Sequence, residues 1–216
     1  MLVADGDPSR DDDSSAVNRA TYDRISRQYA DRQERQKPAD GRWFPVLEDE
    51  FLASVTAHGL IADLGCGPGL DGSRFIRAGF RAVGMDLSAS MLAIAARSLG
   101  GSVAQADLRA LPIRSSSLDG IWCCAALLHI PEDDTSGVLH GFRRALKPDG
   151  TLALVTALGD GHRLEPVPYA PGERRWFAYR HADRLGQQLR ETGFRVRVDD
   201  VVASNREWIT FLVEAV

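Results

Sequence analysis

Ile61-Ala62-Asp63-Leu64-Gly65-Cys66-Gly67-Pro68-Gly69 is the stretch of sequence that decides the fold. It begins with apolar residues typical of a buried strand, includes one carboxylate, and ends in three alternating glycines before a helical pattern starts. Glycine lets the backbone turn tightly and lie close to a ligand. The stretch therefore predicts a strand, a glycine-rich turn and a helix that bind a nucleotide-containing cofactor.

Strand and helix patterns alternate after this loop. Apolar runs predict strands at 60–64, 81–86, 102–106, 118–124 and 150–157, and amphipathic spacings predict helices at 70–78, 88–98 and 134–146. A helix at 181–192 and strands at 194–203 and 207–214 complete the pattern, and no helix separates the last two strands. This order predicts an α/β fold with a Rossmann-like, doubly wound, seven-stranded and mostly parallel sheet that ends in an antiparallel hairpin.

The N-terminal part predicts an acidic tail followed by a helical cap. Residues 1–14 are rich in Asp and have little to bury, so we expect them to be disordered. Apolar residues recur at helical spacings after Ser15, a suitable capping residue, and again before the first strand. We expect a single domain over 15–216, in which a helical cap (15–58) precedes a Rossmann-like core (59–216).

Composition narrows the class of partner. The chain has 216 residues, of which 44% are hydrophobic and 26% charged, and this is enough for one α/β domain with a full core. The net charge of -4 disfavours nucleic acid and anionic membrane, and no apolar run approaches the roughly 20 residues of a membrane span. Cys66, Cys123 and Cys124 lack the spacing of zinc ligands. We expect a cytoplasmic monomer or homodimer with a small-molecule substrate, no disulfide and no metal.

The glycine loop is compatible with two cofactors. Residues 67–72 satisfy the Gly-x-Gly-x-x-Gly dinucleotide pattern, and Asp86 ends the next strand, where an acid that binds ribose is expected. These features suggest NAD. However, a carboxylate at Asp63 suits a ligand that carries an ammonium or sulfonium group and would repel a pyrophosphate. Asp63 and Gly65 favour the second kind of ligand.

The chain resembles the class I S-adenosylmethionine-dependent methyltransferases. Residues 63–69 match the family's first motif, an acidic residue, one residue and then Gly-x-Gly-x-Gly. Later family motifs follow in register: Asp86, Ala106-Asp107-Leu108, Leu118-Asp119-Gly120-Ile121-Trp122 and Leu146-Lys147-Pro148-Asp149-Gly150-Thr151-Leu152. The resemblance covers about residues 15–216 and implies S-adenosyl-L-methionine as cofactor and S-adenosyl-L-homocysteine as product.

The resemblance also implies roles for individual residues. Asp86 would accept hydrogen bonds from both ribose hydroxyls and Asp107 from the adenine amino group, whereas their structural alternatives are a helix N-cap and an ordinary loop carboxylate. Tyr22 and Tyr29 share a helical face that would reach the methionine part, and packing of that face in the core is the alternative. The remaining implied cofactor residues are Asp63, Gly65, Cys66, Gly67, Leu87, Met91, Ala106, Leu108, Cys124 and Ala125.

Candidate acceptor residues follow the fourth strand and the irregular stretch 159–175, which we expect to be a substrate loop. His129 is the candidate catalytic base, with shaping of the pocket as the alternative. Arg174, Arg175 and Arg180 could bind a carboxylate or phosphate or form a solvated face. The candidate substrate-binding residues are Trp43, His129, Tyr169, Trp176, Tyr179 and Arg180, and we expect about half of the aromatic rings to be core instead.

These observations together predict an enzyme that methylates a small molecule. Oxygen is favoured over nitrogen or carbon as the acceptor atom, and we expect a role in natural-product biosynthesis. The sequence after the fourth strand lacks the Asn/Asp-Pro-Pro-aromatic motif by which base-amino methyltransferases hold a flipped base. The alternatives are an RNA or protein methyltransferase, a non-catalytic regulatory module that binds the cofactor, and, least favoured, an NAD-dependent oxidoreductase.

Overall fold

The computed structural model describes residues 12–36, 38, 41–204 and 206–216, and these form an open seven-stranded sheet with the strand order β3-β2-β1-β4-β5-β9-β8. Neighbouring strands among β1 to β5 are parallel, and β9 runs antiparallel to both β5 and β8. The strands are β1 (Leu60–Leu64), β2 (Arg81–Asp86), β3 (Val103–Gln105), β4 (Leu118–Cys124), β5 (Leu146–Ala157), β8 (Phe194–Ala203) and β9 (Glu207–Ala215). The predicted fold class is confirmed.

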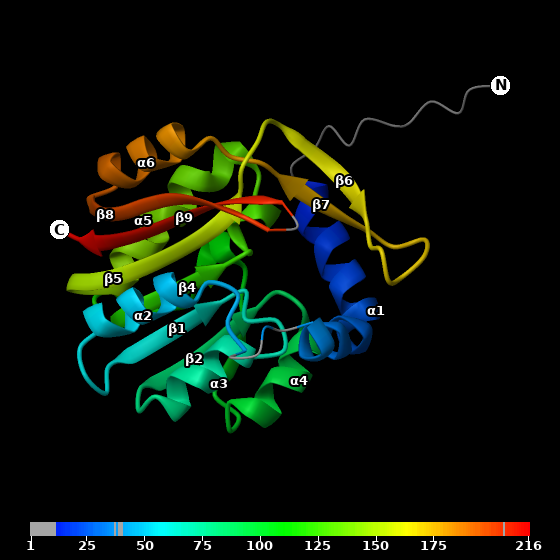
Figure 1. Cartoon of the computed structure of the whole chain (residues 1–216), viewed down its shortest axis with the longest axis horizontal. Helices are drawn as coiled ribbons and strands as arrows, with labels where there is room; N and C mark the ends of the chain where they lie inside the picture. Colours follow the sequence, from blue (N-terminus) through cyan, green and yellow to red (C-terminus); the bar gives the residue numbers. More distant parts are fainter. Residues whose placement is uncertain (1–11, 37, 39–40, 205) are drawn as a thin grey trace.

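Helices cover both faces of this sheet (Figure 1). One face carries α2 (Pro45–Ser54), α3 (Leu70–Arg77) and α4 (Ala89–Ser98), and the other carries α5 (Thr135–Ala145) and α6 (Ala182–Glu191). Short 3-10 turns lie at Leu108–Ala110, Leu127–His129 and Glu132–Asp134. The last two follow β4, so they place His129 at the edge where the parallel strands end.

Aromatic packing fixes α2 and α3 on their face of the sheet. The rings of Phe51, Phe75 and Trp122 contact one another with centroids 5.3 to 5.9 Å apart, and all three side chains are buried. The Trp122 indole donates a 2.8 Å hydrogen bond to Asp71 at the start of α3. This packing corrects the expected cap over 15–58, because α2 is a helix of the sheet face rather than a cover for the ligand edge.

A second structural unit covers the carboxyl ends of the parallel strands. Figure 1 shows α1 (Asp12–Gln36) beside the hairpin of β6 (His162–Pro166) and β7 (Arg174–Ala178) at this edge. The helix begins at Asp12, inside the range 1–14 that we expected to be a disordered tail, and residues 1–11 lie outside the described part. Asn18 holds α1 to the hairpin by accepting from the Trp176 N–H at 2.8 Å and donating to the Trp176 carbonyl at 3.0 Å.

The hairpin corrects the expectation that 159–175 is irregular. Its two strands pair antiparallel in the register Arg163↔Phe177 and Glu165↔Arg175. The prolines that suggested a loop lie at the end of β6 and in the connection that follows it. Because side chains alternate along a strand, Phe177 and Arg175 share one face of the hairpin and Trp176 lies on the other.

None of the helices in the described ranges has both the length and the apolar content needed to cross a membrane.

Candidate active site

The glycine loop after β1 has a backbone conformation that favours glycine. Gly65, Gly67 and Gly69 have φ angles of 72°, 50° and 81°, in the left-handed region. A Cβ atom on Gly65 would lie far inside van der Waals contact with the Ala126 Cβ. The Gly65 and Cys66 N–H groups donate to the Met85 carbonyl at 2.7 and 3.0 Å and hold the loop against β2. A ligand can therefore approach the backbone closely at this point.

Asp86 ends β2 beside this loop. Its Oδ2 accepts from the Gly67 N–H at 2.9 Å, and its Oδ1 accepts from the Ser88 N–H at 2.8 Å. Each oxygen therefore keeps a lone pair for a further donor. Burial raises the pKa of Asp86, although these backbone hydrogen bonds favour the charged form. The carboxylate is placed to receive two hydroxyl groups of a ligand and gains from such donors.

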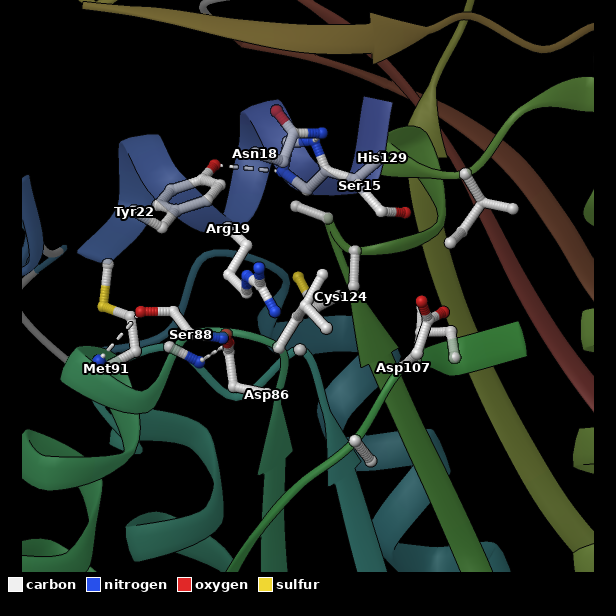
Figure 2. Close-up of a pocket in the computed structure, with 18 of the residues that line it drawn as sticks. Ser15, Asn18, Arg19, Tyr22, Asp86, Ser88, Met91, Asp107, Cys124 and His129 are labelled. Atoms are coloured by element: carbon white, nitrogen blue, oxygen red, sulfur yellow. Dashed lines mark hydrogen bonds between the residues drawn. The ribbon is translucent and has the colours of Figure 1, made fainter. Parts of the chain in front are cut away.

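A cavity of about 760 Å³, part of it open to solvent, lies between the sheet edge and α1. Figure 2 shows Asp86 and Ser88 on one side of it, Asp107 on another, and Tyr22, Asn18 and His129 above them. Predicted residues that line the cavity are Tyr22, Tyr29, Gly65, Gly67, Asp86, Leu87, Met91, Ala106, Asp107, Leu108, Cys124, Ala125 and His129. The structure thus brings most of the predicted cofactor site together.

Asp63 and Cys66 do not line this cavity. The Asp63 carboxylate is buried behind the loop and accepts from the Gly72 N–H at 2.9 Å, at the start of α3. Burial, followed by the charge of Asp71, raises its pKa. Cys66 packs in an apolar cluster with Leu92 of α4 and with Leu99, which follows this helix. Both side chains therefore shape the loop from behind, and direct ligand contact by Asp63 does not occur in this arrangement.

Asp107 is already engaged by a neighbouring cation. Its Oδ2 accepts from Arg109 Nη2 at 2.7 Å, and its Oδ1 accepts from the Arg109 backbone N–H at 2.9 Å. Although burial acts in the opposite direction, these bonds lower the pKa of Asp107. The carboxylate stays ionised and lines the cavity, so a remaining lone pair can still accept an amino group.

His129 and Tyr22 form a hydrogen-bonded pair on the α1 side of the cavity. The Tyr22 hydroxyl lies 3.0 Å from His129 Nε2, and His129 Nδ1 lies 3.0 Å from the Trp176 carbonyl oxygen (Figure 2 shows the first bond). The Trp176 carbonyl can only accept, so we assign the imidazole proton to Nδ1, which leaves Nε2 to accept from Tyr22; the Asn18 side-chain nitrogen, a donor, also lies 3.1 Å from Nδ1. Burial, supported by the charges of Arg175 and Arg206, lowers the pKa of His129 to about 4. The imidazole is therefore neutral near pH 7.

This pKa predicts how stability responds to acid. The unfolded chain binds a proton at His129 near pH 6.5, whereas the folded chain resists protonation until about pH 4. Stability is therefore lost as the pH falls through this window, by about 2 kcal/mol between pH 6.5 and 5. Denaturant unfolding of the wild type and of His129→Gln at several pH values checks this. Equal pH dependence of the two proteins would show that His129 is not buried in its neutral form.

The structure places the aromatic residues that we predicted to bind the acceptor in separate parts of the molecule. Trp43 is 45% exposed and does not line the cavity. Trp176 is buried, and its ring stacks on His162 on the far face of β7, where Trp176 and Tyr179 line a second hollow. Tyr169 packs beside Tyr22, Tyr29 and Ile25 under α1. Of these four aromatic residues, Tyr169 thus lies nearest to the side chains of the candidate site.

Arg180 has a structural role in this arrangement. Its side chain is buried, with Nη2 donating to the Ile130 carbonyl at 2.7 Å and Nε lying 3.0 Å from a Glu132 carboxylate oxygen. It holds the segment after β4 and is therefore not free to bind an acceptor. The expectation that Arg180 contacts substrate is not supported by its surroundings.

Six further residues line the cavity without having been predicted. They are Ser15, Asn18, Arg19, Ser88, Ala126 and Ile130. A signal for three of them was present, because Ser15, Asn18 and Arg19 precede Tyr22 by seven, four and three positions, and such spacings share a helical face. The Ser88 side chain caps α4 and also donates to Asp23 of α1 at 2.6 Å, a tertiary contact with no sequence signal.

The fold and the arrangement of this site resemble those of the class I S-adenosylmethionine-dependent methyltransferases. A seven-stranded sheet with a reversed β9, a glycine loop after β1 and a buried acid at the end of β2 meet around one cavity. Residues 61–150 match the family model described as "Methyltransferase domain". The chain therefore carries a methyltransferase domain.

Known proteins that resemble the chain agree with this class. A malonyl-[acyl-carrier protein] O-methyltransferase of Enterobacter lignolyticus is 32% identical over 115 residues, which are 52% of this chain and 45% of the relative. A ubiquinone biosynthesis O-methyltransferase of Xanthomonas campestris pv. campestris is 32% identical over 120 residues, 52% of this chain and 49% of the relative. The chain thus spans about half the length of these curated relatives.

A solved structure covers nearly the whole chain. The Burkholderia thailandensis 1,6-didemethyltoxoflavin-N1-methyltransferase, crystallised with 1,6-didemethyltoxoflavin and S-adenosylhomocysteine, superposes with a TM-score of 0.72. The two are 20% identical, and the match covers 98% of this chain and 93% of that one. This likeness shows that the elements outside residues 61–150 also follow the class I methyltransferase fold.

Proposed function

We propose that this chain transfers a methyl group from S-adenosyl-L-methionine to an oxygen atom of a small molecule. The observation that carries the proposal is the shared cavity, which joins the glycine loop and Asp86 on one side to the Tyr22–His129 pair on the other. A cofactor and an acceptor can therefore meet in one cavity. The O-methyltransferase names of two relatives support oxygen as the acceptor atom, and a role in biosynthesis accords with them.

The residues present fit the cofactor. Asp86 would hold the ribose hydroxyls, Asp107 the adenine amino group, and Leu87 and Met91 the adenosine faces. The backbone at Gly65 and Gly67 and the carbonyl groups of Cys124 and Ala125 would hold the methionine part, with Tyr29 near its carboxylate. Bound there, S-adenosyl-L-methionine supplies a methyl group activated by a positively charged sulfur and leaves as neutral S-adenosyl-L-homocysteine.

The chain's own contribution to the reaction is alignment and proton transfer. The acceptor oxygen would bond to the methyl carbon that S-adenosyl-L-methionine supplies, and its hydroxyl proton would become strongly acidic as this oxygen loses electron density. A weak base therefore suffices. His129 Nε2, neutral above about pH 4, would take up this proton through the Tyr22 hydroxyl, with Nδ1 anchored on the Trp176 carbonyl.

Replacing His129 with alanine is expected to lower kcat by about 100-fold or more, because a positioned proton acceptor contributes on that scale. The dissociation constant of S-adenosyl-L-homocysteine should change less than about threefold, since the cofactor contacts proposed above do not include this imidazole. Steady-state kinetics and calorimetry separate the two effects. Unchanged turnover would leave His129 as a residue that only shapes the pocket.

The proposed function is tested by incubating the protein with methyl-labelled S-adenosyl-L-methionine and a fractionated metabolite extract. Mass spectrometry should find the label in a small molecule, and Asp86→Ala serves as the inactive control. Label in RNA or protein would contradict the proposed acceptor class. Tight cofactor binding without label in any fraction would indicate a non-catalytic binding module instead.

A further inference from the structure

A partly buried cation that pairs with no carboxylate of the described residues lies next to the Tyr22–His129 pair. Arg175 projects from β7 and is largely buried, with its guanidinium 5.0 Å from the centre of the Phe177 ring and 6.0 Å from that of Tyr22. Its hydrogen bond is a long one, 3.4 Å from Nη1 to the Tyr22 hydroxyl, and its Nε is buried without an acceptor. Within the described ranges, Arg175 forms no ion pair with a carboxylate.

Arg206 brings a second guanidinium to the same ring. It lies 5.0 Å from the centre of Phe177 and 5.6 Å from that of Trp208. Its Nη2 pairs with Glu165 at 2.8 Å, and its Nε is buried without an acceptor. Arg175, Arg206 and Glu165 together carry one net positive charge in a largely buried place. A bound anion would compensate this charge.

The Tyr169 hydroxyl, close to Tyr22, is a further hydrogen-bond donor that could bind an anion. The Tyr169 hydroxyl is buried and has no hydrogen-bond partner among the described residues. It belongs to the apolar cluster under α1 that also contains Tyr22. This hydroxyl and the Arg175 Nε–H, both near Tyr22 and without a partner among the described residues, form a set of donors that an oxyanion can satisfy.

This set of donors lies on the acceptor side of the site. The Phe177 ring is 5.0 Å from the His129 ring, so the guanidinium groups flank the residue that faces the reacting oxygen. Arg175 and Arg206 do not line the cavity that the glycine loop shares with Asp86. The Tyr22 hydroxyl, which contacts Arg175, does line it, so an acceptor with its reacting end at Tyr22 and His129 would have to extend past Tyr22 to place an anionic group at Arg175.

We propose that the methyl acceptor carries an anionic group, a carboxylate or phosphate, which binds Arg175 with help from Arg206 and the Tyr169 hydroxyl. This inference rests on the proposed function and specifies its substrate class. The planar guanidinium of Arg175 can donate two parallel hydrogen bonds to such a group, a geometry that lysine does not offer. Both guanidinium groups lie 5.0 Å from the centre of the Phe177 ring, a cation–π contact that helps to hold them in place.

The chain provides a matched control in Arg174. This residue precedes Arg175 on the same strand, but its side chain is exposed and donates a 3.4 Å hydrogen bond to the Leu164 carbonyl. Replacing Arg174 with methionine removes one positive charge, as Arg175→Met does, but leaves the residues of the proposed site unchanged. Arg175→Lys adds a conservative variant that keeps the charge and removes the paired donors.

The test uses the full chain saturated with S-adenosyl-L-homocysteine, titrated by calorimetry with acetate, benzoate, inorganic phosphate, phenyl phosphate and the neutral benzamide. We expect at least one anion to bind, and Arg175→Met to weaken it at least tenfold, whereas Arg174→Met leaves it unchanged. The anion affinity of Arg175→Lys should lie between those of Arg175→Met and Arg174→Met. Benzamide should bind at least tenfold more weakly than the best anion.

Two results would overturn this inference. One is the absence of Arg175-dependent binding for every anion of the set. The other is that Arg175→Met weakens S-adenosyl-L-homocysteine tenfold but leaves 5′-methylthioadenosine unchanged, because Arg175 would then bind the carboxylate of the cofactor. Failure of the wild type to bind S-adenosyl-L-homocysteine would instead contradict the proposed function, so the two failures are distinguishable.

Discussion

Replacing Asp86 with alanine is expected to weaken the binding of S-adenosyl-L-homocysteine by at least about 100-fold, since two charge-assisted hydrogen bonds of about 1.5 to 3 kcal/mol each would be lost. The carboxylate already accepts from Gly67 and Ser88, so it is fixed in place before a ligand arrives. Little ordering of this side chain is then needed on binding. Isothermal titration calorimetry measures the change directly.

Loss of binding by unfolding must be separated from loss of the contact. Asp86→Asn keeps one acceptor oxygen and should bind between the wild type and Asp86→Ala. Circular dichroism at the assay temperature shows whether each variant is folded, and Asp183→Ala, at the start of α6, provides a control in which a carboxylate is lost far from the loop. A folded Asp86→Ala protein with wild-type affinity would mean that the cofactor does not bind at β2.

Replacing Gly65 with alanine should damage both stability and cofactor binding. The residue has a left-handed φ of 72°, and the added Cβ would meet the Cβ of Ala126, which is attached to backbone and cannot rotate away. The conformational strain and the overlap together amount to about 3 kcal/mol. In a chain of 216 residues this lowers Tm by about 6 to 12 °C, and displacement of the loop should abolish binding.

A substitution at Gly100 measures the cost of backbone strain without the steric overlap that Gly65→Ala would add. Gly100 has a φ of 58°, and a Cβ built on it meets nothing within 4 Å. Gly100→Ala therefore carries the conformational cost of about 1 kcal/mol alone and should keep its cofactor affinity. Differential scanning calorimetry and a binding titration compare the two variants. Equal losses for both would show that the Ala126 contact does not constrain the loop.

The parallel core could be predicted closely because each of its elements is decided by local sequence. The strands at 60–64, 81–86 and 118–124 were predicted with the bounds observed, since each is an apolar run that ends at a turn. The hairpin of β6 and β7 could not be predicted. Its pairing joins residues whose charges and prolines suggest a loop, and long-range contacts with α1 hold it.

The site shows the same division between local and tertiary information. Gly65, Gly67 and Asp86 line the cavity as predicted because motif and register place them at one sheet edge. Asp63 was expected there too, but the start of α3 takes its carboxylate. The three arginines 174, 175 and 180 are alike in sequence. Only the tertiary structure shows that Arg174 is exposed, that Arg175 pairs with no carboxylate of the described residues, and that Arg180 has a structural role.

The way in which α1 is attached has an energetic consequence. The helix is held by polar bonds of Asn18, Thr21 and Asp23, each of which adds about 1 kcal/mol, and by a small apolar cluster around Ile25, whereas α5 buries Val138, Leu139 and Phe142 in the main core. Lifting α1 away from the sheet is therefore much cheaper than detaching α5. If a ligand of the cavity leaves on the α1 side, its release would disturb this small cluster and these hydrogen bonds, and the sheet would not need to loosen.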